Sequence, residues 1–298
     1  MRKTLALSLL AAATLGAHEY GFLEYYFVDC DHPIHLAGRY RHIGRAEFEK
    51  HKHGDINYAD GYAAAFYTHF LDEDNSLTYG VGYDYLKMDW DKNPRFREDT
   101  FNYATASIGL VSMTLERWRW IVNGGFSVDA NHFDFGKSGV YHAMLWGRYH
   151  YNENCGVHVG ALGFYGIKNG YALPIIGFDW RFGAHWRLAT IFPVNLSLAY
   201  LFNDYWSMEA AYSGFGIYRY PRRAHDGRHG FHDPIFSIYS SGVDLNLKYD
   251  YDHLFRIAIG GGWNFGGWVL IKNSENRDGK YYKYNSAPYA QATIAFTF

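Results

Sequence analysis

The chain has 298 residues and a net charge of −2, with 28 Lys and Arg against 30 Asp and Glu. This balance excludes the strongly basic surface that nucleic-acid binding needs, so no nucleic-acid partner is expected. Tyr, Phe and Trp make up 20% of the residues, beside 32 Gly and 7 Pro, and such a composition favours strands over helices.

The first residues, "MRKTLALSLLAAATLGA", combine Arg2 and Lys3 with an uncharged apolar run and small residues at its end. This order predicts a signal peptide over 1–17, hence export. The run is too short for a membrane-spanning helix, and a buried N-terminal helix is the weaker alternative. The aromatic segment 18–34 that follows is expected either to plug a lumen or to lie at its periplasmic mouth.

Alternating apolar and polar residues then recur along the whole chain, as in 77–85, where Leu77, Tyr79, Val81, Tyr83 and Tyr85 share one face. This period of two predicts strands. Thirteen stretches qualify: 35–45, 58–71, 77–89, 100–113, 118–128, 139–151, 155–167, 171–181, 187–202, 206–218, 236–249, 254–270 and 287–298. Pro193 interrupts the ninth, and splitting it into 187–192 and 195–202 gives fourteen strands, with twelve as the alternative.

Alternation alone does not tell a soluble sandwich from a membrane barrel, because either has one apolar face. Three features favour the barrel: full charges such as Arg119 and Arg256 on the polar face, aromatic residues near the strand ends, and connections of two lengths. Short turns such as 72–76 alternate with longer connections such as 219–235. Short periplasmic turns, long extracellular loops and aromatic girdles are typical of outer-membrane barrels. We therefore expect one barrel domain over 35–298.

The terminal "ATIAFTF", together with the signal peptide and the ladder of amphipathic strands, resembles bacterial outer-membrane β-barrel proteins of the porin type. The stretch 185–208 is also similar to poorly characterised barrel families. The resemblance implies an all-β, antiparallel up-and-down transmembrane barrel in the cell outer membrane. It further implies that Ile294, Phe296 and Phe298 lie in a closing strand that pairs with 35–45 and is recognised by the barrel assembly machinery.

The polar faces of the strands predict the residues that line the lumen. They are Arg39, Arg41, Asp84, Arg119, Asn123, His142, Arg148, His158, Asp179, Arg181, Arg187, Glu209, Asp244, Lys248 and Arg256. Basic side chains outnumber acidic ones in this set. Two interpretations remain open: a pore with a mild preference for anions, or ion pairs that fill a narrow barrel.

Cysteine and histidine give weaker indications. Cys30 and Cys155 both map to the periplasmic side, where a disulfide could tether the N-terminal segment to the rim. His225, His229 and His232 lie in one expected loop and are weak candidates for zinc or copper ligands, but solvated polar loops are the commoner explanation. No metal and no cofactor are expected.

These features predict a passive outer-membrane channel or transporter for small hydrophilic solutes, surrounded by outer-membrane lipid. The alternative is a surface or structural barrel that acts through its extracellular loops. A lipid-modifying enzyme at the rim is less favoured, because no nucleophile stands at a useful spacing from His142 and its neighbours. The expectation is therefore a protein that is not an enzyme. Its oligomeric state is not indicated by the sequence.

Overall fold

The computed structural model describes residues 32–50, 53–94, 96–167, 169–193, 195–219, 235–252, 254–273 and 279–298. Within these residues the chain forms β-strands joined by turns and loops. The strands are β1 (Ile34–Glu47), β2 (Asp55–Phe70), β3 (Asn75–Trp90), β4 (Thr100–Ser112), β5 (Trp118–Asp129), β6 (Val140–Asn152), β7 (Cys155–Gly166), β8 (Asn169–Phe182), β9 (Trp186–Phe192), β10 (Asn195–Leu201), β11 (Trp206–Arg219), β12 (Ile235–Tyr251), β13 (Phe255–Lys272), β14 (Lys280–Tyr284) and β15 (Pro288–Thr297). No helix in this part of the chain is long and apolar enough to cross a membrane.

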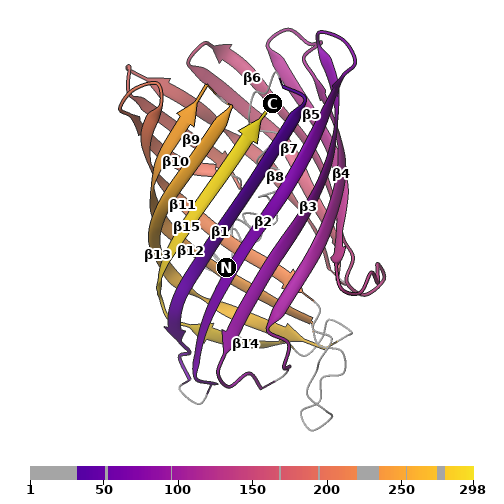
Figure 1. Cartoon of the computed structure of the whole chain (residues 1–298), viewed down its shortest axis with the longest axis vertical. Helices are drawn as coiled ribbons and strands as arrows, with labels where there is room; N and C mark the ends of the chain where they lie inside the picture. Colours follow the sequence, from indigo (N-terminus) through magenta and orange to yellow (C-terminus); the bar gives the residue numbers. More distant parts are fainter. Residues whose placement is uncertain are drawn as a thin grey trace, which may run out of the picture.

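Fourteen of these strands close into one antiparallel barrel (Figure 1). Each of β1 to β12 pairs with its successor in sequence, and β12 pairs with β13. β15 closes the wall by pairing with β13 on one side and β1 on the other. The predicted fold class and strand number are therefore confirmed, and the short β14 is an addition that pairs with the outer half of β13.

The seam between β15 and β1 extends to the last residue. Ile34 N–H donates to the Phe298 carbonyl at 3.2 Å, and Phe298 N–H donates to the Ile34 carbonyl at 2.8 Å. Ile294 and Phe298 are exposed on the outside, whereas Tyr289 and Thr297 are buried on the inside. Closure thus gives backbone partners to both terminal strands, which would otherwise be free edges.

The strands alternate between an outward apolar face and an inward face. On β3, Tyr79, Val81 and Tyr83 are exposed, whereas Thr78 and Gly80, at the alternate positions, are buried. Aromatic rings gather at the short-turn end, where Trp186 meets Tyr200 with centroids 4.9 Å apart. Similar contacts there join Trp118 to Tyr149, Trp206 to Tyr249 and Phe255 to Phe296. An apolar outer band with an aromatic girdle is the surface that a bilayer requires.

Pro193 follows β9 and ends it, as the sequence predicts. The Phe192–Pro193 peptide bond is cis, and β10 begins two residues later. A prolyl residue has no N–H for a ladder hydrogen bond. β9 and β10 therefore form a separate hairpin of two seven-residue strands, which restores an even number of strands.

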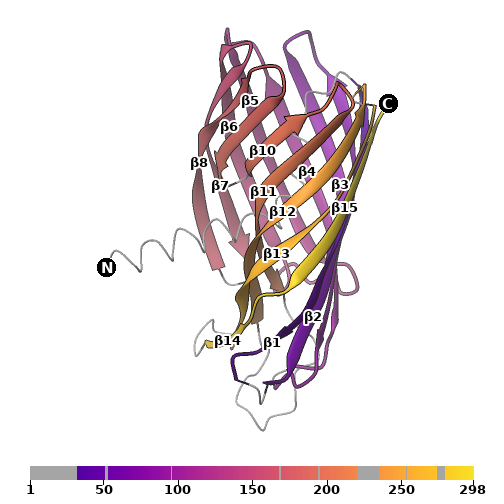
Figure 2. The same ribbon diagram turned by 90° about the vertical axis from the view of Figure 1, so that its left-hand side faces the viewer.

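The long-loop end of the barrel is packed with aromatic side chains. Phe101 on β4 and Phe236 on β12 have ring centroids 4.9 Å apart, although five strands separate β4 from β12 around the wall. Phe96 stacks on Phe236 at 5.1 Å, and Trp90 meets Tyr282 of β14 at 5.1 Å. In Figure 2, β1 to β3 and β12 to β14 extend to this lower end. We call this group, with its buried neighbours Phe48, Tyr58 and Tyr284, the outer aromatic cluster.

The predicted signal peptide over 1–17, Cys30 and most of the aromatic segment 18–34 lie outside the described residues, which begin at residue 32. The barrel itself begins at Ile34, one residue before the expected boundary.

Candidate functional site: the barrel lumen

The residues that were expected to line the lumen lie on the inward face of their strands. Arg41, Asn123, His158, Asp179 and Asp244 are buried. Eight more are half-buried: Arg39, Asp84, Arg119, His142, Arg148, Glu209, Lys248 and Arg256. Arg181 and Arg187 are exposed near the short-turn end. The side chains of the expected set do not form one site, and most of them fall into four polar groups.

The first group is a fully buried ion pair between β1 and β2. Arg41 and Asp60 stand directly opposite each other in the ladder. Arg41 Nε donates to Asp60 Oδ1 at 2.9 Å, and Nη2 donates to Oδ2 at 3.1 Å. The guanidinium of the neighbouring Arg39 lies over the Tyr62 ring at 5.2 Å. Two parallel hydrogen bonds hold this buried pair in one geometry.

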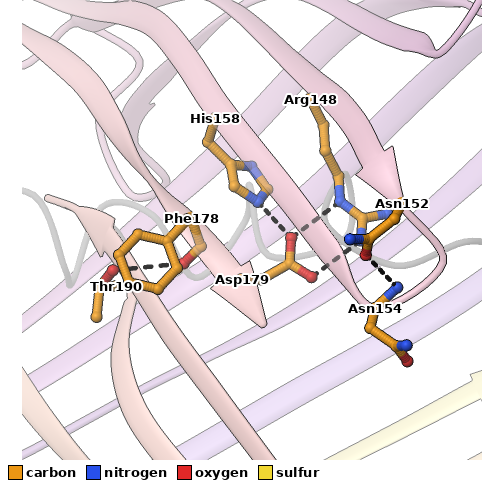
Figure 3. A network of polar contacts seen from close by, with 7 residues as sticks. All are labelled: Arg148, Asn152, Asn154, His158, Phe178, Asp179 and Thr190. Carbon is orange, nitrogen blue, oxygen red and sulfur yellow. Dashed lines mark hydrogen bonds and ion pairs between the residues drawn. The ribbon is translucent and has the colours of Figure 1, made fainter. Parts of the chain in front are cut away.

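The second group lies on β6, β7 and β8 toward the short-turn end (Figure 3). Arg148 Nε and Nη2 donate to Asp179 Oδ2 and Oδ1 at 3.0 and 2.9 Å. His158 Nε2 lies 2.7 Å from Asp179 Oδ2. The imidazole of His158 also stacks on Trp146, with centroids 5.2 Å apart and planes 7° apart. Asp179 of β8 is therefore held by His158 of the neighbouring β7 and by Arg148 of β6, one strand further along the wall.

The third group surrounds Asp244 on β12. Ser213 and Tyr289 donate hydroxyl hydrogen bonds to Asp244 Oδ2, the latter at 2.7 Å. Asn246 donates to Asp244 Oδ1, and Gln291 Nε2 donates to Asn246 Oδ1 at 2.9 Å. The hydrogen bonds to the Asp244 carboxylate all come from neutral side chains. Together with the bond from Gln291, they link β11, β12 and β15 on the inside of the barrel.

The fourth group lies at the short-turn mouth. Lys248 pairs with Glu209 at 2.6 Å, and Arg256 pairs with Asp250 at 2.7 Å. Arg181 and Arg187 stand directly opposite each other across the β8–β9 hairpin. Neither arginine has a described carboxylate within 4.0 Å. Like charges placed opposite each other destabilise a ladder. The pair therefore places two positive charges side by side on the inward face of the mouth, while the short turns around it also carry exposed acidic residues, namely Asp72, Glu73, Asp74, Glu116, Glu153, Asp204 and Asp252.

Two further hydrogen bonds involve His142, Asn123 and Asp84 of the expected set. His142 Nε2 lies 3.0 Å from Asn123 Oδ1, and Thr105 Oγ1 donates to Asp84 Oδ2 at 3.0 Å. Arg119 stands directly opposite Arg148 between β5 and β6.

Sequence reasoning missed the acidic partners Asp60 and Asp250, and also the buried Asp129. All three follow the inward phase of their strands, so the alternation of β2, β5 and β12 could have found them. They bring the acidic side chains of the inward face almost level with the basic ones. The inward face as a whole therefore carries little net charge.

Sequence reasoning also missed an apolar stripe on the inside of the wall. The stripe runs over β2 and β4 to β9 and consists of Tyr62, Ala64, Phe66, Val111, Ile121, Met144, Trp146, Leu162, Phe164, Ile175 and Ile191, with Leu173 buried beside it on the inner face of β8. In a barrel that passes only polar solutes, the inward face is expected to be polar. This lumen instead has a charged mouth, a mixed middle and an aromatic outer end.

No group of three or more potential metal ligands occurs among the described residues. The weak candidates His225, His229 and His232 lie outside them. Cys155 is half-buried and forms no disulfide within the described part of the chain; the tether expected with Cys30 remains a prediction, because Cys30 lies outside that part.

No protein-family model matches the chain. An uncharacterized protein of Chlamydia trachomatis is 26% identical over 204 residues, which are 68% of this chain and 63% of that protein. A second, of Chlamydia muridarum, is 26% identical over 64% of this chain and 60% of its own length. The matched region thus spans less than two thirds of these two relatives. A Chlamydia pneumoniae protein is 21% identical over 89% of this chain and 87% of its own length.

Several solved structures are similar to this chain at low identity. An outer-membrane channel from Pseudomonas putida F1 is 8% identical over 90% of this chain and 96% of that one, with a TM-score of 0.47. A deletion mutant of the TodX monoaromatic hydrocarbon channel is 12% identical over 97% and 94%, with a TM-score of 0.46. LpxR from Salmonella typhimurium is 9% identical over 89% and 100%, with a TM-score of 0.36. The closed fourteen-stranded wall, its apolar outer face and its aromatic girdle make this chain a β-barrel of the bacterial outer membrane.

Proposed function

We propose that the barrel is a passive channel through which small hydrophilic solutes diffuse along their gradients, anions in preference to cations. The observation that carries this proposal is the arginine pair Arg181 and Arg187 on the inward side of the short-turn mouth. Fixed positive charge at a pore entrance raises the local concentration of anions and lowers that of cations. No step in this mechanism requires a cofactor.

The size of the barrel supports a conducting lumen of modest width. Barrels of eight strands are filled by their own side chains, whereas barrels of sixteen leave an aqueous channel. Fourteen strands lie between these limits. The outer aromatic cluster is then the narrowest part of the route, and the charged mouth is the part that selects among solutes.

The test is ion selectivity in planar bilayers. Folded protein is inserted under a tenfold salt gradient, and the reversal potential is compared with that of the double variant Arg181→Gln, Arg187→Gln. We expect the wild type to favour anions and the variant to shift toward no preference. The control Arg45→Gln removes a charge at the opposite, long-loop end, where Arg45 is already paired with Asp55. A reversal potential that is the same in all three proteins would contradict the selectivity proposal.

A second candidate function is a surface or structural barrel with a filled lumen. The contacts of Phe96 and Phe101 with Phe236 favour it, because they join opposite walls at the outer end. Complete absence of current from folded protein would support this candidate over the channel.

The barrel assembly machinery is the proposed partner in folding. β15 ends the chain with apolar Ile294, Phe296 and Phe298, and it closes the seam against β1. Replacement of Phe298 by Asp is therefore expected to lower the amount of assembled barrel in the outer membrane.

A further inference from the structure

The barrel wall is shorter along the barrel axis at the β9–β10 hairpin than at the flanking strands. Each of these strands has seven residues, whereas the flanking β8 and β11 have fourteen. At about 3.3 Å per residue, seven residues extend about 23 Å. With a strand tilt of about 40°, they cover roughly 18 Å of a bilayer whose apolar band is about 25 Å thick. The hairpin therefore ends inside the outer half of the apolar band.

The neighbouring strands continue past the end of the hairpin. The ladder between β8 and β9 runs from Phe182 to Ile176 and stops there, while β8 remains paired with β7 as far as Asn169. The ladder between β11 and β10 stops at Tyr212, while β11 remains paired with β12 as far as Arg219. Figure 2 shows this side of the barrel, with β10 between β8 and β11. In the described part of the chain, no strand fills the space between these two edges.

The outer surface beside these two strand edges faces lipid. On this surface, Ile176 is 62% exposed and Tyr165, on the neighbouring β7, is 71% exposed. Pro174 lies on the stretch of β8 that borders the opening. Proline occurs in sheets mainly where no ladder hydrogen bond is needed, such as an edge strand. The position of Pro174 therefore agrees with a β8 edge that has no strand beside it in the described part of the chain.

The inside of the opening is apolar. Leu173 and Ile175 of β8 and Ile191 of β9 are buried on the inner face, next to Trp146 and Phe164 of the apolar stripe. The outer aromatic cluster, by contrast, joins opposite walls at the long-loop end. An apolar molecule in the stripe thus has its shortest route to lipid through the wall rather than along the axis.

We propose that the space between β8 and β11 above the β9–β10 hairpin is a lateral window between the lumen and the outer leaflet. It admits small amphipathic molecules, with a largely apolar body and at least one hydrogen-bonding group. Open sheet edges are costly in hydrocarbon, and the polar group of such a molecule can bond to the edges as it passes. This route is separate from the proposed axial passage of hydrophilic solutes and does not depend on it.

The test closes the window and measures the uptake of an amphipathic probe. Four residues in an alternating pattern are inserted after Phe192 and four before Asn195, so that the hairpin grows along both open edges. The matched control carries the same eight residues after the exposed Lys137 in the β5–β6 connection. Full-length proteins are produced in a Gram-negative host, and entry of N-phenyl-1-naphthylamine is followed by its fluorescence. A shift in gel mobility on boiling establishes that each barrel is folded.

We expect severalfold faster dye entry with the wild type and the control than with the lengthened hairpin. If the lengthened hairpin does not fold, Leu173→Arg replaces it, with Leu86→Arg as control because Leu86 is also buried on the inner face but lies on β3, outside the apolar stripe. Equal dye entry in the window variant and its control, or no entry above the host without the barrel, would overturn the window. Dye entry without ionic current would refute the axial channel and leave the window in place.

Discussion

At the scale of single residues, the buried pair of Arg41 and Asp60 is the most sensitive point of the wall. Their side chains are 2% and 0% exposed. Removal of one partner from a buried ion pair leaves an uncompensated charge and typically costs about 3–5 kcal/mol, whereas an apolar pair of similar volume is often tolerated.

We therefore expect Arg41→Met to lower the free energy of unfolding by about 3–5 kcal/mol. The double variant Arg41→Met, Asp60→Leu should recover most of that loss. Urea unfolding in phospholipid vesicles measures both. A double variant no more stable than Arg41→Met alone would show that the pair is not the source of the effect.

The turn between β2 and β3 gives a pH-dependent prediction outside the membrane. Hydrogen bonds from the backbone N–H of Asp74 and from Asn75 hold the pKa of the Asp72 carboxyl below 3.8. A carboxyl whose pKa is depressed by folding stabilises the folded state above its unfolded pKa, and this contribution is lost as the pH falls through the folded pKa.

The variant Asp72→Ala should accordingly be less stable than the wild type by a constant amount above about pH 4. The difference should shrink as the pH falls further. Unfolding curves from pH 7 to pH 2 measure this, with the neighbouring Asp74→Ala as control. A difference that stays constant down to pH 2 would exclude the proposed role of the Asp72 carboxylate.

At the scale of elements, the sequence predicts most strands because the outward face has to be apolar for lipid. Pro193 even locates the β9–β10 turn, since proline cannot donate a ladder hydrogen bond. β14 was not predicted: its five residues, Lys280–Tyr284, lie in an expected long loop and are too short to show a clear period. Its pairing comes from the extended outer half of β13.

The lumen could be predicted only in part, for a reason that lies in strand register. Alternation places Arg41 on the inner face, but its partner Asp60 depends on how β1 and β2 are aligned. That alignment includes an irregularity between Ile43 and Ala46, which no residue pattern reveals. The same holds for Phe101 and Phe236, which meet only because the barrel brings distant strands together.

At the scale of the whole molecule, the barrel has two distinct ends. The short-turn end carries an aromatic girdle and the inward-facing pair Arg181 and Arg187, while the long-loop end is narrowed by the outer aromatic cluster. Charge and apolar surface are thus separated along the lumen. This separation suits a protein that draws solutes in at one end and restricts their passage at the other.

Single-channel recording in planar bilayers tests the central claim of a conducting lumen most directly. The account predicts discrete current steps from folded wild-type protein. It predicts larger steps from Phe236→Ala, which removes the ring that joins the two walls, and unchanged steps from Phe265→Ala, whose side chain is exposed on the outside. Folded protein that gives no current steps, either as the wild type or as Phe236→Ala, would contradict the claim.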